Sequence, residues 1–181
     1  SRVARALAAA GVAGVDIGAI RKDIIAVDDG SCDATGEAAA RAGRDMPAGA
    51  RFTLLRHEKN KGKGAALKPG LAACAGDYIL VQDADLECDP ADYPALLGPI
   101  LAREADAVFG SRILHGAHAP RSALYHYGGV FLSRCFNAFF GTSFTDITGC
   151  YKVFPRRVVP VLLNLPSNDF VFDAVEMPYA L

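Results

Sequence analysis

The chain has 181 residues, 51% of them hydrophobic, and its 19 basic and 20 acidic side chains give a formal net charge of −1. This length suits one domain with a sizeable core and leaves little room for a second. A nearly neutral chain has no overall field to recruit nucleic acid or an anionic membrane, so we expect no nucleic-acid partner and only local contacts with polyanions.

The five cysteines are odd in number and lack the paired spacing of metal ribbons and redox motifs. We expect reduced, mostly buried thiols and hence a cytoplasmic location. The alternative is a location at the cytoplasmic face of a membrane. No secretory signal and no stretch of about 18 uncharged apolar residues is seen, so no bilayer-spanning segment is predicted. Because the chain begins at Ser1 and stops at Leu181 inside an apolar stretch, we expect a single domain over residues 1–181 that is truncated at both ends.

Hydrophobic patterning predicts alternating helices and strands. An alanine-rich helix is expected over residues 1–14, and apolar runs at Ile24–Val27 and Phe52–Leu55 are typical of buried strands that enter polar, glycine-containing loops. The later predicted elements are a helix over Gly64–Cys74, a strand at Tyr78–Gln82, a helix over Pro90–Ala102, a strand at Asp106–Phe109 and an amphipathic helix over Ser122–Phe140. This order predicts an α/β fold with a Rossmann-like, mostly parallel sheet and helices on both faces.

The stretch VQDADLECDP, residues 81–90, places carboxylates at alternating positions directly after an apolar strand. In open α/β sheets the ligand site lies beyond the carboxyl ends of the strands. Asp83, Asp85 and Glu87 would point to the same side of an extended segment, where their repulsion is costly unless a cation neutralises it. Such oxygen ligands suit Mg²⁺ or Mn²⁺, whereas the alternative is a solvated acidic turn. For Asp89 we expect only a cap on the following helix.

Two further loops carry ligand-binding residue types. VDDGSCDAT, residues 27–35, is either an ordinary turn or a place where Asp28 or Asp29 binds a base or a ribose hydroxyl. NKGKGAAL, residues 60–67, sets Lys63 between glycines that would let the backbone approach an anion closely, although it lacks the spacing of a Walker motif and loop lysines are usually solvated.

The order of the motifs is more specific than any one of them. VDDGS, NKGKGAAL, QDADLE, GSR at residues 110–112 and TDITGCYKVF at residues 145–154 together resemble family 2 glycosyltransferases of the GT-A fold, over roughly residues 20–176. Within this family the chain is most similar to the polyprenyl-phosphate sugar transferases, the group that includes dolichol-phosphate mannose synthase. The resemblance implies metal-dependent, inverting transfer of a hexose from a UDP- or GDP-linked sugar to a polyprenyl phosphate.

The resemblance also implies roles on the donor side. Asp28 and Asp29 would contact the base or ribose, and Lys63 would lie near the nucleotide. The Mg²⁺ or Mn²⁺ ion would be held by three acids: Asp83, Asp85 and Glu87. Such a cation stabilises the negative charge that develops on the leaving diphosphate, which makes Asp85 a catalytic residue as well as a ligand.

On the acceptor side, the resemblance implies that Arg112 and Arg121 meet the acceptor's phosphate and that Asp146 is a catalytic acid near the acceptor. Asp173 would be a substrate-binding acid that closes the site. The segment FVFDAVE departs from the family pattern, because Glu176 lies one position late.

Three other functions stay open. A family 2 transferase that acts on a sugar hydroxyl would need a general base, for which Asp146 is the candidate. A sugar-1-phosphate nucleotidyltransferase would be expected to carry a glycine-rich basic signature near its amino terminus, and none is visible. A nucleotide-sugar-binding module without turnover would not need the intact pair Asp83 and Asp85.

Other residues receive ordinary interpretations. The four histidines, His57 among them, lack ligand spacing and are expected on the surface or in loops. The phenylalanines between residues 131 and 140 are expected in the core. The alternative lays this helix on a membrane, beside a lipid acceptor, as a peripheral contact.

Overall fold

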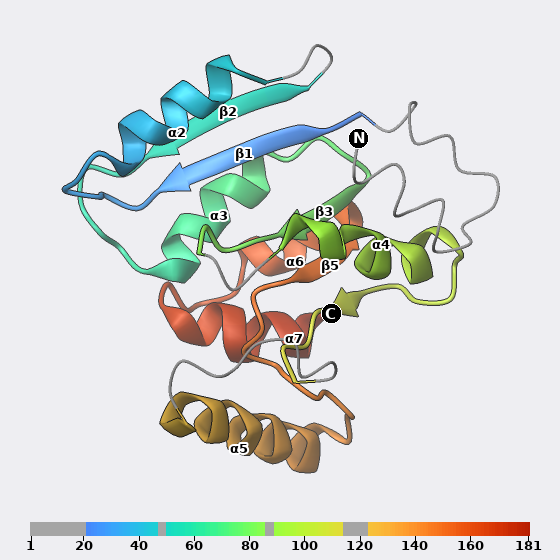
Figure 1. Cartoon of the computed structure of the whole chain (residues 1–181). Helices are drawn as coiled ribbons and strands as arrows, with labels where there is room; N and C mark the ends of the chain where they lie inside the picture. Colours follow the sequence, from blue (N-terminus) through green and yellow to red (C-terminus); the bar gives the residue numbers. More distant parts are fainter. Residues whose placement is uncertain (1–20, 47–49, 86–88, 114–122) are drawn as a thin grey trace. The chain divides into compact units, whose positions relative to one another are not determined.

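The computed structural model describes residues 21–46, 50–85, 89–113 and 123–181 (Figure 1). The helix predicted over residues 1–14 lies outside them. The chain divides into two compact units, which are taken in turn: of the described residues, unit 1 comprises those within 80–155 together with Leu181, and unit 2 comprises those within 21–79 and 156–180.

Unit 2 is built on a parallel pair of strands, β1 (Asp23–Asp28) and β2 (Arg51–Arg56), in a register that sets Asp28 opposite Arg56. Parallel neighbours need a crossover, and α2 (Thr35–Arg44) supplies it. α3 (Lys63–Ala73) packs against β1, so α2 and α3 cover opposite sides of the strand pair (Figure 1). Both strands and α3 confirm the predicted elements.

The remainder of unit 2 comes from the end of the chain. It contains a 3-10 turn at Arg156–Val158, α6 (Val159–Leu163), a π-helical turn at Phe172–Glu176 and α7 (Met177–Ala180). α3 contacts both α6 and the π-helical turn. The first turn of α3 is therefore covered by residues about a hundred positions later in the chain.

A three-stranded sheet of order β3-β5-β4 carries unit 1, formed by β3 (Tyr78–Val81), β5 (Lys152–Pro155) and β4 (Val108–Phe109), with β4 antiparallel to β5. A 3-10 turn at Pro90–Asp92 leads into α4 (Tyr93–Leu101). The Asp89 side chain accepts a hydrogen bond from the Ala91 N–H at 2.9 Å, which confirms the predicted cap.

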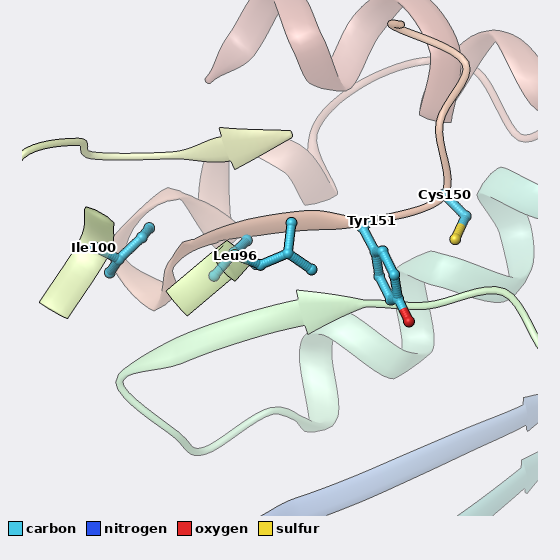
Figure 2. Packing of buried hydrophobic residues seen from close by; sticks show 5 residues of the cluster. Leu96, Ile100, Cys150 and Tyr151 are labelled. Carbon is cyan, nitrogen blue, oxygen red and sulfur yellow. The ribbon is translucent and has the colours of Figure 1, made fainter. Parts of the chain in front are cut away.

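The core of unit 1 lies between α4 and the sheet. Its buried members are Leu96, Ile100, Cys150, Tyr151 and Val153, with Leu80, Tyr93, Leu97 and Val108 packed against them (Figure 2). Cys150 is disulfide-bonded, so the expectation of reduced thiols is wrong for this residue, while Cys32, Cys74 and Cys135 are free.

The helix α5 (Ala123–Phe140) turns unexpected residues outward. Phe136 is buried at 5% exposure and stacks with the rings of Phe140 and Phe144. Phe131 and Phe139 are 66% and 84% exposed, so the expectation that they lie in the core is wrong. No helix in the described ranges is both long enough and apolar enough to span a membrane.

Candidate functional site

Asp28 is the last residue of β1, and its side chain is buried within unit 2. Its Oδ1 accepts the Ser31 N–H at 2.9 Å, and its Oδ2 lies 3.1 Å from the Nε of Arg56, the residue opposite it in the register. The hydrogen bonds from Ser31 and the charge of Arg56 hold the pKa of Asp28 below the usual 3.8. Asp28 therefore fixes the turn that leaves β1.

Asp29 joins the same turn to the loop after β2. It lies 2.6 Å from His57 Nδ1, and its carboxylate also accepts the N–H groups of Lys61 and Gly62 at 2.9 to 3.1 Å. Burial alone would raise the pKa of Asp29, but the bonds from His57 and these two amides outweigh it and lower that pKa. A cavity of about 370 Å³ opens beside the pair, lined by Gly30, Ser31, Arg56, His57 and Glu58.

His57 lies in the loop after β2, as predicted for the histidines, but its contact with Asp29 was not predicted. Only 16% of its side chain is exposed, and its partner Asp29 follows the residue that pairs with Arg56 in the β1–β2 register. Parallel strands in register place the residues just beyond their ends side by side. The contact between Asp29 and His57 could therefore have been predicted from the pairing of the two strands. The spacing of ligands along a single segment could not have revealed it.

The glycines of NKGKG let another part of the chain approach closely. Gly62 has φ 98°, and the N–H groups of Gly64 and Ala65 donate to the carbonyls of Asp169 and Asn168 at 3.2 and 2.8 Å. A Cβ on Gly64 would lie 2.7 Å from the Cβ of Phe172. In this structure residues 168–172 approach the loop closely and cover the first turn of α3. The predicted approach to an anion stays a prediction.

Lys63 and Asp173, both predicted to bind substrate, form an ion pair. The Nζ of Lys63 lies 2.8 Å from Oδ2 of Asp173, whose side chain is fully buried, whereas the lysine side chain is 23% exposed. The ring of Phe170 adds a cation–π contact, with its centroid 5.5 Å from Nζ. Lys63 is therefore held at the start of α3 by an acid from the far end of the chain.

The segment in which Glu176 departs from the family pattern forms a π-helical turn. A π-turn takes one residue more than an α-helical turn, and Phe172–Glu176 forms such a turn. Glu176 accepts hydrogen bonds from the hydroxyl and the N–H of Ser167, at 2.6 and 3.2 Å. Asp173 is thus paired with Lys63 on α3, and Glu176 with Ser167.

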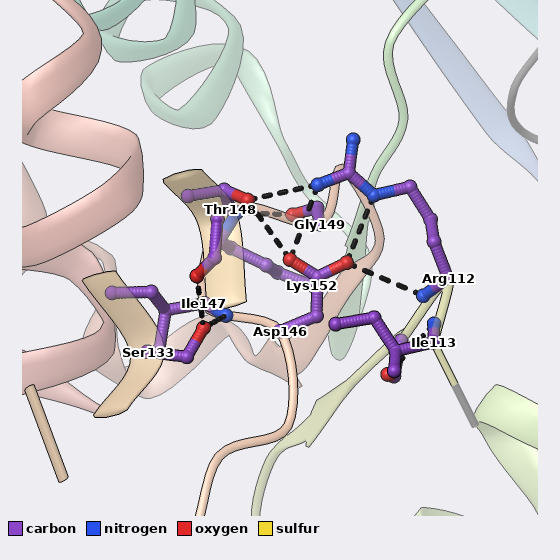
Figure 3. A network of polar contacts seen from close by, with 10 residues as sticks. Arg112, Ile113, Ser133, Asp146, Ile147, Thr148, Gly149 and Lys152 are labelled. Atoms are coloured by element: carbon purple, nitrogen blue, oxygen red, sulfur yellow. Dashed lines mark hydrogen bonds and ion pairs between the residues drawn. The ribbon is translucent and has the colours of Figure 1, made fainter. Parts of the chain in front are cut away.

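In unit 1, Arg112 and Asp146 form a network of polar contacts (Figure 3). The guanidinium donates from Nε to Oδ2 at 2.8 Å and from Nη2 to Oδ1 at 3.1 Å, a bidentate geometry, and the Arg112 N–H adds a contact at 3.3 Å. The Thr148 hydroxyl donates to Asp146 at 2.9 Å and accepts from Nη2 at 2.8 Å. The structure thus brings together two of the predicted acceptor-side residues.

This network controls the charge of Asp146. The carboxylate is buried, which by itself would raise its pKa, but the hydrogen bonds and charge of Arg112, with the Thr148 hydroxyl, hold that pKa below 3.8. At neutral pH Asp146 is an ionised, fully engaged acceptor of hydrogen bonds. Its two oxygens hold the guanidinium of Arg112 in place.

Two residues that support the network escaped the sequence-based prediction. Lys152 is fully buried on β5 and donates from Nζ to the carbonyl of Gly149 at 2.7 Å. The buried hydroxyl of Ser133 on α5 accepts the Ile147 N–H at 3.1 Å. Together they bond to the backbone of the turn over residues 146–149. A lysine within an apolar run and a serine in a helix carry no local signal of this role.

The predicted metal ligands Asp83 and Asp85 follow β3 in unit 1, and Glu87 lies outside the described residues. Within the part of the chain that the structure describes, no group of three or more His, Cys, Asp or Glu side chains is gathered as a metal would require. The two described carboxylates are nevertheless the hard oxygen donors that suit Mg²⁺ or Mn²⁺. Arg121, the second predicted phosphate ligand, also lies outside the described residues.

The described residues that were predicted to form the site are distributed over the two units. Asp28, Asp29, Lys63 and Asp173 belong to unit 2, whereas Asp83, Asp85, Arg112 and Asp146 belong to unit 1. The α/β architecture is that of the GT-A glycosyltransferases: a glucosyl-3-phosphoglycerate synthase from Mycobacterium tuberculosis, in complex with phosphoglyceric acid, aligns with a TM-score of 0.56 at 21% identity, over 83% of this chain and 50% of that one. The structure of that enzyme with UDP aligns with a TM-score of 0.53 at 22% identity.

The family model for glycosyl transferase family 2 matches residues 6–162, and the chain therefore belongs to this family. A low-salt glycan biosynthesis hexosyltransferase, Agl6, from Haloferax volcanii is 32% identical over 136 residues, 73% of this chain and 30% of that protein. A dolichol-phosphate mannosyltransferase from Pyrococcus furiosus is 32% identical over 103 residues, 57% of this chain and 28% of that protein. The chain thus spans less than half the length of these curated relatives.

Proposed function

We propose that the chain is the catalytic part of a metal-dependent, inverting hexosyltransferase that takes its sugar from a nucleotide-diphosphate donor and transfers it to a polyprenyl phosphate. Relatives whose names specify polyprenyl acceptors support this choice, among them a dodecaprenyl-phosphate galacturonate synthase from Rhizobium johnstonii, 36% identical over 93 residues, 51% of this chain and 27% of that protein. The donor nucleotide is UDP or GDP.

The observation that carries the proposal is the bidentate pairing of Arg112 with Asp146. A sugar hydroxyl must lose a proton to a general base, whereas a phosphate monoester is already ionised and needs positioning more than deprotonation. Asp146 is a poor base because its carboxylate is engaged by Arg112 and its pKa is lowered. The guanidinium side chain is 44% exposed, so it can also bind an anion from solvent. This arrangement favours a phosphate acceptor over a hydroxyl.

Asp83 and Asp85, with Glu87, would hold the cation. The ion's contribution is to stabilise the charge of the leaving nucleotide diphosphate. The chain's own contribution is to place these carboxylates at the end of β3, which the buried core residues Ile79 and Val81 anchor. Lys63, fixed by Asp173, would lie near the nucleotide.

α5 would bring the acceptor site to a membrane surface. Tyr127, Phe131 and Phe139 are exposed at spacings of four and eight residues, which puts them on one stripe of the helix. Aromatic side chains on one helical face, with the other face buried, suit a helix that lies in the lipid interface. We place this contact at the cytoplasmic face of the membrane that carries the polyprenyl phosphate.

The acceptor class can be tested through Asp146 and Arg112. We expect Asp146→Asn to raise the KM for a short polyprenyl phosphate with a modest loss of kcat and a flat pH profile, since positioning is lost and not a base. Arg112→Lys should not restore acceptor binding, because lysine lacks the bidentate fork. The kinetics of both variants are measured by transfer of radiolabelled hexose from UDP- and GDP-hexoses in the presence of Mn²⁺. Arg44→Lys, at an exposed position on α2, is the control.

A loss of 10²- to 10⁴-fold in kcat for Asp146→Asn, with the acidic limb of the pH profile removed, would instead identify a general base and a hydroxyl acceptor.

The metal site can be tested through Asp85. Asp85→Ala should abolish Mn²⁺-dependent binding of nucleotide diphosphate and leave the fold intact, since the residue follows β3 and is not part of the buried core. Calorimetric titration with UDP and GDP measures the binding, and circular dichroism checks the fold. Unchanged affinity in this variant would contradict the assignment.

A further inference from the structure

The hydroxyl of Tyr151 is buried without a hydrogen-bond partner among the described residues. Tyr151 directly precedes β5, and its ring belongs to the core of unit 1 at 7% exposure. In Figure 2 the ring extends from the chain at β5 toward β3, with the hydroxyl at its far end. Buried hydroxyls are normally bonded, because an unpaired one loses its contacts with water and gains none in return.

The surroundings of this hydroxyl are acidic. Burial raises the pKa of Tyr151, and Tyr93 and the carboxylates of Asp92, Asp89 and Asp85 raise it further. The phenol therefore keeps its proton at neutral pH and can donate it in a hydrogen bond. In Figure 2 the ring points toward β3, and Asp83 and Asp85, the two described residues expected to hold the cation, lie two and four residues beyond the end of that strand.

The position of the ring is built into the fold. The Tyr93 ring packs edge-on against it, with centroids 5.9 Å apart, and the Tyr93 hydroxyl donates to Oε1 of Gln82. A Cβ on Gly110, the glycine of GSR, would lie 2.7 Å from the Cβ of Tyr151. Of two neighbouring tyrosines in one core, one has its hydrogen bond inside the chain, and the other has none among the described residues.

We propose that the Tyr151 hydroxyl is a ligand-binding group that donates a hydrogen bond to an oxygen of the cation–nucleotide diphosphate complex bound at Asp83 and Asp85. The inference rests on the proposed function and extends it to a residue outside the predicted metal ligands. The acceptor oxygen belongs either to the diphosphate or to water bound to the cation. Only in the second case would loss of the hydroxyl weaken the binding of Mn²⁺ in the absence of nucleotide.

The test compares Tyr151→Phe with Tyr93→Phe in the full chain. Without ligand, Tyr151→Phe should melt at the same or a higher temperature than the unaltered chain, because a buried unpaired hydroxyl is removed, whereas Tyr93→Phe should melt lower. In calorimetric titration with Mn²⁺ and UDP or GDP, Tyr151→Phe should bind about tenfold more weakly, as expected for one lost hydrogen bond. A parallel loss of affinity for Mn²⁺ alone assigns the bond to water, and unchanged Mn²⁺ affinity assigns it to the diphosphate.

Two results would overturn the inference. A melting temperature for Tyr151→Phe as low as that of Tyr93→Phe would mean that the hydroxyl is already bonded within the chain, and nucleotide affinity equal to that of the unaltered chain would mean that no ligand uses it. If the unaltered chain binds Mn²⁺ but neither nucleotide, the proposed function is contradicted. In that case, equal Mn²⁺ affinities of the unaltered chain and Tyr151→Phe would overturn this inference separately.

Discussion

At the scale of single residues, the ion pair of Lys63 and Asp173 is asymmetric. The carboxylate is fully buried, and the lysine side chain reaches solvent. Removing one partner of a buried pair is costly chiefly when the remaining charge stays buried. We therefore expect Lys63→Met to lower the free energy of unfolding by about 3 kcal/mol, and Asp173→Asn to lower it clearly less, because water can hydrate the ammonium that remains.

Urea denaturation of the two variants measures this difference, with Lys59→Met on the exposed part of the same loop as the control. Equal losses from Lys63→Met and Asp173→Asn would show that burial of the acid does not dominate the pair. The double variant should regain part of the loss of Lys63→Met, since no charge is then left buried.

At the scale of elements, the two faces of α5 make a second prediction. Phe136→Ala should cost about 3 to 5 kcal/mol of stability because it empties a packed aromatic cluster. Phe139→Ser should leave stability nearly unchanged, since this ring is exposed, and should weaken binding to vesicles of phosphatidylethanolamine and phosphatidylglycerol. Thermal melts and vesicle co-sedimentation measure the two effects. Vesicle binding that is insensitive to both Phe131→Ser and Phe139→Ser would rule out the stripe as the contact.

α5 also shows what the sequence can and cannot predict about an element. Its bounds, Ala123–Phe140, agree with the predicted helix to within one residue, because apolar residues recur at helical spacing. Its orientation was wrong, because apolar side chains occur on both faces and periodicity alone does not say which face is buried. Ser133, on the buried side, is bonded to a backbone N–H from the loop before β5, a contact that no local pattern encodes.

Some strands could be predicted from the sequence and others could not. β1, β2 and β3 were predicted because each is a short apolar run that ends in polar residues. β5 was not predicted, since it begins with Lys152, a charged residue that is fully buried and donates to the carbonyl of Gly149. Of the site, the motifs predicted which side chains matter. They could not predict that Asp29 pairs with His57, or Lys63 with Asp173, because these partners are brought together by tertiary packing.

At the scale of the whole molecule, acids with lowered pKa values link folding to pH, and three of them were predicted as site residues. Asp28 and Asp29 lie in unit 2 and Asp146 in unit 1, and each has a pKa below 3.8 in the folded chain. A lowered pKa means that the unfolded chain binds more protons near pH 4, so the free energy of unfolding falls as the pH falls. This contribution is fully present above the unfolded pKa of 3.8 and is lost as the pH drops through the lower folded values.

We therefore expect urea midpoints that are flat near neutral pH and fall steeply below about pH 4, a loss that each of these acids shares. Asp146→Asn should lower the midpoint at neutral pH, because Arg112 loses its ionised partner, and should make the acid loss shallower, because one linked proton is removed. Glu104→Gln, at an exposed position beyond α4, should leave both the midpoint and the slope as they are. A midpoint that rises on acidification, or a slope unchanged by Asp146→Asn, would mean that the Arg112 network does not hold this carboxylate ionised in the folded chain.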